Sequence, residues 1–258
     1  MKRIICAAAA LLTLLSTAGC AGSGAGSGAA PDKTVPAAAG TETPKASSSD
    51  TPSPSETESA DALPAPKLTL IGHASFKIKT SEGKVVYIDP YYEGDYGEGA
   101  DLILVTHGHS DHNKTGLCAR NEGCVVLTHK ENINKDGSFN VYDAGWMTVE
   151  PVAAYNGNHP KGTGSGFVLS FDGITVYIAG DTSKIGEMAA LKAKNIDYAF
   201  FPIDGKYNMG PAEAAECAAV VGAKHNTPVH FFDADPEDFR PENLLKMAYG
   251  ETIELIRQ

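Results

Sequence analysis

The feature that most constrains the fold of this chain is the motif "HGHSDH" at residues 107–112, which ends the apolar run "LILVTH". It places three imidazoles and a carboxylate, all metal-binding groups, at the end of a predicted strand, where a rigid element can hold them. His107 and His109 are two residues apart, so in an extended loop both can project to one side. Asp111 and His112 follow the turn and can face a second ion. The chain must therefore fold so that a strand end opens on a metal site.

Three further candidate ligands stand at the ends of later strand-like segments. His159 comes after "VEPVAAY", Asp181 follows "ITVYI", and His230 lies in the short run "PVHFF". Active sites are commonly built from loops on a rigid scaffold, so we expect these residues to converge with the motif at one edge of the fold. Imidazole with carboxylate ligation suits zinc best, while manganese, iron or nickel, and occupancy by a single ion, stay open.

The order of the predicted elements indicates a layered α/β (α+β) fold. Expected strands span residues 67–72, 75–80, 84–90, 100–107, 123–129, 146–155, 164–171, 173–182, 196–203 and 227–232. Expected helices span residues 183–194, 210–224 and 235–250. Many strands come first, and strands then alternate with helices. This order favours two sheets packed face to face with helices outside them.

The N-terminal segment resembles a bacterial secretory signal. Lys2 and Arg3 precede an apolar stretch over residues 4–15, and small residues then lead to Cys20. The apolar stretch is too short to span a bilayer, and its ending resembles the lipobox at which lipoprotein signals are cut and the new N-terminal cysteine is lipidated. Thr17 stands where that pattern prefers leucine, so an ordinary secreted protein stays an alternative.

The rest of the chain divides in two. Residues 21–66 are mainly Gly, Ser, Ala, Thr and Pro, which cannot bury enough apolar surface to offset the entropy of ordering. We predict a lipoprotein signal peptide over residues 1–20, a disordered tether over 21–66, and one extracytoplasmic domain over 67–258, anchored to the cell membrane by a lipid on Cys20. With 21 Lys and Arg against 32 Asp and Glu, the chain is poorly suited to bind nucleic acid.

Taken together, the motif and the later ligands resemble the metallo-β-lactamase superfamily of dinuclear metallohydrolases. The resemblance extends to "LIGHASFKI", "YIDP", "HPKGTGSGFV" and "FPIDGKYNM" and covers essentially all of residues 67–258. It is stronger for the branch of small metal-dependent hydrolases, which includes an ascorbate-phosphate lactonase, than for the true β-lactamases. It implies a four-layer αββα sandwich in which one metal is bound by His107, His109 and His159, the second by Asp111, His112 and His230, and both by a bridging Asp181.

The chemistry that this resemblance implies is metal-assisted hydrolysis of a small-molecule substrate. Two divalent ions, most readily zinc, lower the pKa of a shared water toward about 7, and the resulting hydroxide attacks an ester, lactone or phosphoester centre. The alternative is a non-catalytic, metal-binding lipoprotein. Nucleic-acid processing, which some relatives of this fold carry out, fits poorly with the acidic charge of the chain.

Several residues near the ligands have predicted supporting roles. The candidates for a catalytic role are Asp181 and His73. His73 lies in "IGHAS", and the resemblance places it near the metals. It would position substrate or donate a proton there, unless it is a histidine bonded to backbone in a turn. Asp89 in "YIDP" is expected to support a metal-binding histidine through the second ring nitrogen. A flexible rim is expected at Gly162, Gly164 and Gly166.

The remaining assignments concern the pocket and the cysteines. Two lysines could contact an anionic substrate or simply lie solvated at the surface, and these are Lys161 and Lys206. Candidates for the pocket wall are Tyr207, Asn208 and Met209. The sequence does not decide between a place in the core and a place in the pocket wall for Tyr91, Tyr92 and Tyr96. Cys118 and Cys124 either close a small disulfide loop or stay two thiols, and Cys217 is expected to be a buried core residue.

Overall fold

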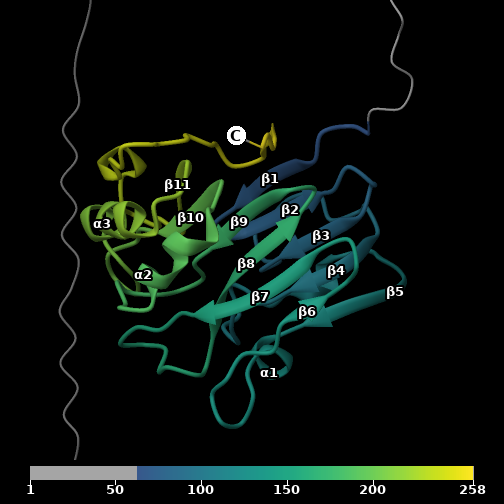
Figure 1. Ribbon diagram of the computed structural model, residues 1–258, viewed down its shortest axis with the longest axis horizontal. Coiled ribbons are helices and arrows are strands. Elements are labelled where there is room, and N and C mark those ends of the chain that lie inside the picture. The colour runs from purple at the N-terminus through teal and green to yellow at the C-terminus, as the bar shows by residue number, and fades with distance from the viewer. Residues whose placement is uncertain (1–62, 258) are drawn as a thin grey trace, which may run out of the picture. The chain divides into compact units, whose positions relative to one another are not determined.

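The computed structural model describes residues 63–257, in which two six-stranded mixed sheets face each other (Figure 1). The predicted signal peptide, Cys20 and nearly all of the predicted tether lie outside these residues. Within them, no helix has the length and apolar character needed to cross a membrane. The first strand begins at Lys67, where the sequence predicts the start of the folded domain.

The strands are shared equally between the two sheets. The first sheet, in the order β12-β1-β2-β3-β4-β5, contains β1 (Lys67–Gly72), β2 (Ser75–Lys79), β3 (Val85–Ile88), β4 (Ala100–Leu104), β5 (Arg120–Leu127) and β12 (Glu251–Glu254). The second, in the order β11-β10-β9-β8-β7-β6, contains β6 (Tyr142–Asp143), β7 (Thr148–Ala153), β8 (Ser165–Phe171), β9 (Ile174–Ile178), β10 (Tyr198–Pro202) and β11 (His225–Val229). The α-helices are α1 (His129–Asn132), α2 (Met188–Leu191) and α3 (Pro211–Val221), and the 3-10 turns are η1 (Thr115–Leu117), η2 (Lys192–Lys194) and η3 (Pro236–Asp238).

The main core lies between the sheets. Side chains alternate along a strand, so Val86 and Ile88 of β3 point into this core while Tyr87 points to the other face. Across the core, the rings of Phe76 and Phe200 meet edge to face with centroids 4.9 Å apart. Both side chains are at most 1% exposed, so each sheet buries its apolar face against the other.

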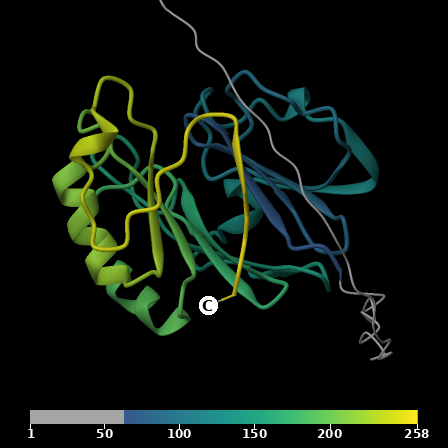
Figure 2. The same cartoon turned by 90° about the horizontal axis from the view of Figure 1, so that it is seen from above.

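The outer faces of the two sheets are covered differently. On the second sheet, α2 and α3 pack over Tyr177 and Phe201. Figure 2 shows helices on the outer side of this sheet. On the first sheet, Tyr96 and Cys118 from the connecting segments pack over Tyr87. The predicted α/β sandwich is confirmed, and the side chains that cover the outer face of the first sheet come from connecting segments.

Two predicted helices differ from the observed structure. The helix expected over residues 183–194 is reduced to α2 and η2. The helix expected over residues 235–250 is wrong, because only η3 forms there and the unpredicted strand β12 follows Gly250.

The second error has a local cause. Pro241 has no N–H to donate and keeps the preceding residue out of the helical region. The chain instead runs beside β11, where Asn226 N donates to Asn243 O at 2.8 Å and Leu245 N donates to Asn226 O at 2.8 Å. Leu244 packs into the outer core and Leu245 into the main core, which is the alternation of an extended segment.

The strand directions bring the candidate ligands to one edge. Strands β3, β4 and β5 are parallel to each other, as are β9, β10 and β11. The carboxyl ends of parallel strands meet at the same edge of a sheet, which is where α/β folds bind ligands. His107 follows β4, Asp181 follows β9 and His230 follows β11. The fold therefore delivers residues from distant parts of the sequence to one place.

Candidate metal centre

The first group of candidate ligands consists of His107, His109 and His159. One ring nitrogen from each lies within 4.8 Å of the others. The ring of His159 lies 4.4 Å from that of His107 and 4.2 Å from that of His109, measured between centroids. His107 and His159 are buried and His109 is exposed, so this group opens to solvent on the His109 side. The structure thus brings together the three histidines that the resemblance assigns to one metal.

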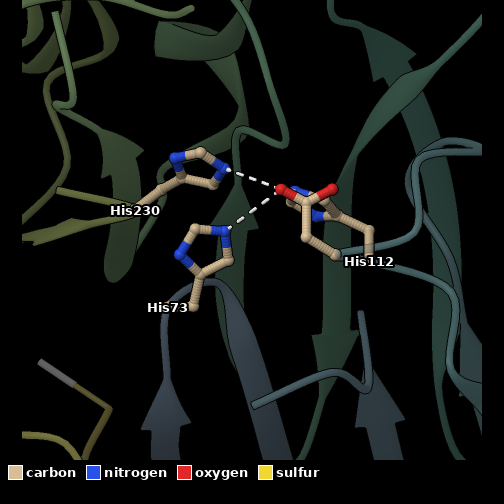
Figure 3. Close-up of side chains that lie close together, drawn as sticks. His73, His112 and His230 are labelled. Atoms are coloured by element: carbon tan, nitrogen blue, oxygen red, sulfur yellow. Dashed lines mark ion pairs between the residues drawn. The ribbon is translucent and has the colours of Figure 1, made fainter. Parts of the chain in front are cut away.

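The second group gathers around the carboxylate of Asp111. Its Oδ2 atom lies 3.5 Å from His73 Nε2 and 3.9 Å from both His112 Nε2 and His230 Nε2. Figure 3 shows the rings of His73, His112 and His230 converging from different elements. One ligand atom from each of these four residues lies within 4.8 Å of the others, so together they could hold a metal ion. The three residues predicted for the second metal are therefore joined by His73.

Asp181 lies between the two groups and is 6% exposed. Its Oδ1 atom is 3.3 Å from His112 Nε2 and 3.5 Å from His230 Nε2, both in the second group. Its Oδ2 atom is 3.9 Å from His107 Nε2 and 3.8 Å from His159 Nε2, both in the first group. Each carboxylate oxygen thus faces a different group, which is the arrangement needed for a bridging ligand.

The inward atoms of this cluster are buried without hydrogen-bond partners. In the described part of the chain, such atoms include the Nε2 atoms of His73, His107, His112 and His230, and Oδ1 of Asp181. Leaving a buried polar atom unpaired costs about 1–3 kcal/mol, so several at one point indicate a partner of another kind. Divalent cations accept lone pairs from imidazole and carboxylate at once. The residues present therefore fit a metal centre.

Apart from His112, where burial is outweighed by neighbouring carboxylates that raise the pKa to about 9, the electrostatics favour ligand forms that can bind a cation. Burial lowers the pKa of His107 to about 2, and burial also lowers the pKa values of His73 and His159, so these rings are neutral near neutral pH. Burial opposes ionisation of Asp181, but the neighbouring histidines, led by His112, hold its pKa below the usual range. Neutral imidazoles and an ionised carboxylate are the forms that donate lone pairs to a metal.

Two buried aspartates hold the second group in place. Asp89 accepts hydrogen bonds from Thr106 N at 2.7 Å and Thr106 Oγ1 at 2.6 Å, and its Oδ2 lies 2.8 Å from His112 Nδ1. This is the supporting role predicted for it. Asp204, which the sequence analysis missed, has Oδ2 at 3.1 Å from His230 Nδ1. Like Asp89, it comes just after a buried strand. This position is the feature of the sequence that could have identified it as a supporting residue.

The carboxylate of Asp204 is fixed by its own loop. Its Oδ1 atom accepts from the backbone N–H groups of Lys206, Tyr207 and Asn208, and its Oδ2 accepts from Asn208 Nδ2 at 2.8 Å. Burial alone would raise the pKa of Asp204, but these donors and the His230 ring hold it well below the usual range. A fixed, ionised carboxylate orients the ring that it faces.

The structure places His73 both in a turn and beside the second group. It lies in the turn between β1 and β2 with φ of 55°, and its carbonyl accepts from His230 N at 2.9 Å. Its ring also lies 3.8 Å from the His230 ring and lines a cavity. His73 is therefore both held in a turn and directed at the second group.

Of the three glycines that were predicted to form a flexible rim of the site, only Gly162 lies in an open turn. Gly162 has φ of 87° and open space around it. Gly164 pairs with His107 across an isolated β-bridge, and Gly166 lies inside β8. A Cβ on Gly166 would come within 2.7 Å of the Ile178 and Ala179 carbonyls, so that position is required for strand packing. The rim prediction is wrong for Gly164 and Gly166.

The other predicted residues divide between surface, core and pocket. Lys161 is exposed and pairs with Glu187, while Lys206 lies over the Tyr207 ring at 4.9 Å. Tyr207 lines the pocket as predicted, but Met209 is fully buried in the outer core, so its prediction as pocket wall is wrong. The cysteines described by the structure are free thiols, with Cys118 and Cys217 buried and Cys124 half-buried.

A cavity of about 410 Å³ opens onto the ligand cluster. Its wall is formed by Tyr91, His109, Ser110, Asp111, Asn158, His159, Asp181, Tyr207, His230 and Phe232. The volume lies in the range of pockets that take small molecules. The reactive edge is thus accessible to a small ligand whose other atoms would meet aromatic side chains.

Comparison with known proteins agrees with this geometry. The family model described as "Beta-lactamase superfamily domain" matches residues 67–230. A UPF0173 metal-dependent hydrolase of Ligilactobacillus salivarius is 33% identical over 207 residues, covering 69% of this chain and 94% of that protein. A UPF0173 metal-dependent hydrolase of Thermococcus kodakarensis is 31% identical over 229 residues, covering 73% of this chain and 99% of that protein.

Solved structures show the same fold. A protein of Parabacteroides distasonis assigned as a metal-dependent hydrolase aligns with a TM-score of 0.61 at 29% identity, covering 69% of this chain and 91% of that one. Igni18, a metallo hydrolase of Ignicoccus hospitalis, aligns with a TM-score of 0.60 at 23% identity, covering 76% and 100%, and shares the fold. With its candidate ligand residues gathered at one edge of the sandwich, the chain belongs to the metallo-β-lactamase superfamily as a metal-dependent hydrolase.

Proposed function

We propose that this hydrolase holds two divalent cations, with zinc preferred, and cleaves an ester, lactone or phosphoester bond in a small molecule. The observation that carries the proposal is the position of Asp181, whose two oxygens face two separate groups of histidines. Each group supplies at least three ligand atoms within 4.8 Å of one another. A single-ion site would leave one set of buried nitrogens unpaired.

When bound, such cations supply a nucleophile by lowering the pKa of water and polarise the bond to be cleaved. The protein residues supply position and exclusion of water. Asp89 fixes the His112 ring through a hydrogen bond at Nδ1, and the Asp204 carboxylate faces His230 Nδ1 at an ion-pair distance of 3.1 Å; both Nε2 atoms are directed inward. Tyr91, Tyr207 and Phe232 wall the cavity above the cluster.

His73 and Asp111 form the part of the site suited to move a proton. His73 Nε2 lies 3.5 Å from Asp111 Oδ2, and Asp111 is the more exposed of the two. Burial lowers the pKa of His73, so its ring is neutral near neutral pH and can accept or pass on a proton beside the leaving group. We assign His73 to substrate positioning or to a proton relay, in which the neutral ring would accept the proton that the attacking water loses and then donate it to the leaving group, and we assign Asp181 to the bridging position.

The proposed location is the outer face of the bacterial cell membrane. Its support is the sequence of residues 1–20, which ends in small residues at Cys20, followed by the polar segment 21–66. Labelling of the chain by a palmitate analogue in a bacterial host, with Cys20→Ala as control, tests the anchor. The proposal requires label on the wild-type chain and none on the variant, and equal labelling would overturn it.

Hydrolysis is tested with the zinc-loaded chain against a panel of esters, lactones, phosphodiesters and β-lactams. We expect turnover of at least one of the first three classes, and a loss of at least about a hundredfold in kcat/KM for Asp181→Ala. Asp172→Ala, in the hairpin turn between β8 and β9, is the control and should keep wild-type activity. Tight zinc binding with no turnover of any substrate would instead favour a metal-binding lipoprotein.

A further inference from the structure

A second cavity, of about 510 Å³, adjoins the cavity above the ligand cluster. It is lined by His73, Tyr91, Tyr92, Glu93, Lys114, Phe231, Phe232 and Tyr249. Two of these residues, Tyr91 and Phe232, also line the first cavity. A third, His73, lies with its ring 3.8 Å from that of His230, a wall residue of the first cavity. The two spaces therefore share walls and can hold two parts of one molecule.

The wall of this second cavity is mainly aromatic. Tyr249 meets Tyr92 edge to face at 5.1 Å and stacks on Phe231 at 4.9 Å, measured between ring centroids. Phe232 packs edge on against His73 at 5.1 Å. Aromatic side chains that already contact one another present rigid apolar surfaces to a ligand at small entropic cost. A planar ring is the ligand shape that such surfaces hold best.

The aromatic wall is fixed by buried residues. Tyr96 is 6% exposed, and its hydroxyl donates to Tyr92 O at 3.0 Å and accepts from Tyr91 N at 3.3 Å. Tyr92 N also donates to Ser75 Oγ at 3.2 Å. Gly72 leaves room for the Tyr92 ring, since a Cβ there would lie 2.2 Å from its Cδ1 atom. The position of Tyr92 is therefore set by several neighbours at once.

The charges at the cavity favour an anionic group on that ring. Lys114 is exposed, and its Nζ lies 4.3 Å from the centroid of Tyr91, the ring shared by both cavities. Its backbone N donates to Pro90 O at 2.8 Å, which ties it to the same loop. At the first cavity, the positive charge of the proposed pair of divalent cations would exceed the negative charge of the Asp111 and Asp181 carboxylates. Glu93 is the opposing charge in the wall and is exposed.

We propose that this second cavity binds the non-reacting part of the substrate, a planar ring carrying an anionic group, with the ring against Tyr92 and Tyr249 and the anion at Lys114. The inference rests on the proposed function for the position of the reacting bond. It adds a substrate class, an ester, lactone or phosphoester of an anionic aromatic compound. Tyr91 and Phe232 then mark the boundary between the two parts of the substrate.

The test measures binding instead of turnover. Naphthalene sulfonate, a planar anion whose sulfonate is a weak metal ligand, is titrated into the zinc-loaded full chain by calorimetry. Comparison probes are methanesulfonate, naphthalene methanol and naphthylmethylammonium. We expect naphthalene sulfonate to bind at least about tenfold more tightly than each of them. Tighter binding of the naphthyl cation, or equal binding of all four, would overturn the proposal.

Exposed variants locate the bound probe. Lys114→Gln should weaken naphthalene sulfonate binding about threefold to fivefold, and Tyr92→Ala about tenfold. Glu93→Gln should leave binding unchanged or strengthen it. The matched control is Lys135→Gln in the exposed turn after α1, which should have no effect. Unchanged affinity in both Lys114→Gln and Tyr92→Ala would overturn the assignment. Because binding is the readout, its loss is distinguishable from a failure of hydrolysis.

Discussion

The Nδ1 atom of His112 lies 2.8 Å from the Oδ2 atom of Asp89, and both side chains are almost completely buried. This contact turns the other ring nitrogen of His112 toward Asp111 and Asp181. The carboxylate that accepts from Nδ1 also accepts from Thr106, next to His107. Thr106 Oγ1 in turn lies 2.9 Å from His107 Nδ1, so a single buried aspartate couples candidate ligands of both groups.

Replacing Asp89 with Asn should therefore weaken zinc binding about tenfold to a hundredfold. An amide N–H facing Nδ1 would favour the tautomer that carries its proton on Nε2, which cannot bind a metal. Asn tolerates the left-handed backbone of this position, where φ is 46°. Zinc affinity is measured by competition with a chelator.

A matched control for this variant is Asp172→Asn. Asp172 also has a positive φ, of 49°, and accepts from Ser81, but it lies in the β8–β9 turn. It should bind zinc as the wild type does. Equal affinity of Asp89→Asn and wild type would show that the contact with His112 is not needed for ligation.

The zinc affinity of the metal-free protein should rise with pH. Burial alone would lower the pKa of His112, but the carboxylates of Asp181 and Asp89 raise it to about 9. The metal binds the neutral ring, so below this pKa zinc must displace one proton and its affinity should rise roughly tenfold per pH unit. Chelator competition between about pH 6.5 and 8.5 measures the slope. A slope of zero would contradict the ion-paired state of His112.

The same shift predicts how the stability of the metal-free protein depends on pH. The folded pKa of His112 lies above its unfolded value of 6.5. The protonated ring therefore stabilises the fold fully below about pH 6.5, and this contribution is lost as the pH rises through about 9. Urea unfolding of the chelated protein should show a falling midpoint from about pH 7.5 to 9, where His73, His107 and His159 are neutral in both the folded and unfolded states and add no slope. Bound zinc should remove the fall, because it keeps His112 neutral throughout.

Replacing Asp204 with Asn should affect mainly the second metal site. Asp204 faces His230 Nδ1 directly, whereas its link to the first group runs through Asn208 and Asn156 to His159 N, so the affinity of the second site should fall by about tenfold or more while that of the first is largely kept. The control is Asp197→Asn, another buried aspartate, which accepts from Thr175 N and pairs with Lys224 away from the site. Two-site zinc titration separates the outcomes, and an equal loss at both sites would contradict the assignment.

The close approach of Gly164 to His107 gives another test. A Cβ at residue 164 would lie 2.9 Å from His107 Cβ and 3.4 Å from Thr106 O, so Gly164→Ala must displace a candidate ligand. We expect about tenfold weaker zinc binding at the first site. Gly157→Ala, where no heavy atom lies within 4 Å of the added Cβ, should bind zinc normally. Similar affinities for the two variants would argue against ligation by His107.

The sequence predicted the candidate ligands better than their surroundings. His107, Asp181 and His230 each follow a short apolar strand, so periodicity placed them at strand ends. Parallel pairing aligns the ends of β9, β10 and β11 within one sheet, and the packing of the two sheets brings the residue after β4 beside them. Asp204 was missed because its role depends on the ring that it faces, and that ring comes from another strand. Phe231 and Phe232 were predicted to end a strand, yet they line a cavity whose other wall comes from residues 91–92 and 114.

The helix predicted over residues 235–250 failed for a different reason. Its apolar spacing fits a helix, but Pro241 and pairing with β11 favour an extended segment. Tertiary contacts of this kind lie between residues far apart in sequence, so local patterns do not contain them. The same segment leads into β12, which covers the free edge of β1.

The central claim is that paired cations are held by residues on both sides of Asp181. The most direct measurement is the zinc content of the purified full chain, determined by plasma mass spectrometry after dialysis against zinc and then against buffer. The account predicts two zinc ions per chain in the wild type and at most one in Asp181→Ala. A wild-type chain that retains less than one zinc ion, or an Asp181→Ala variant that retains two, would contradict it.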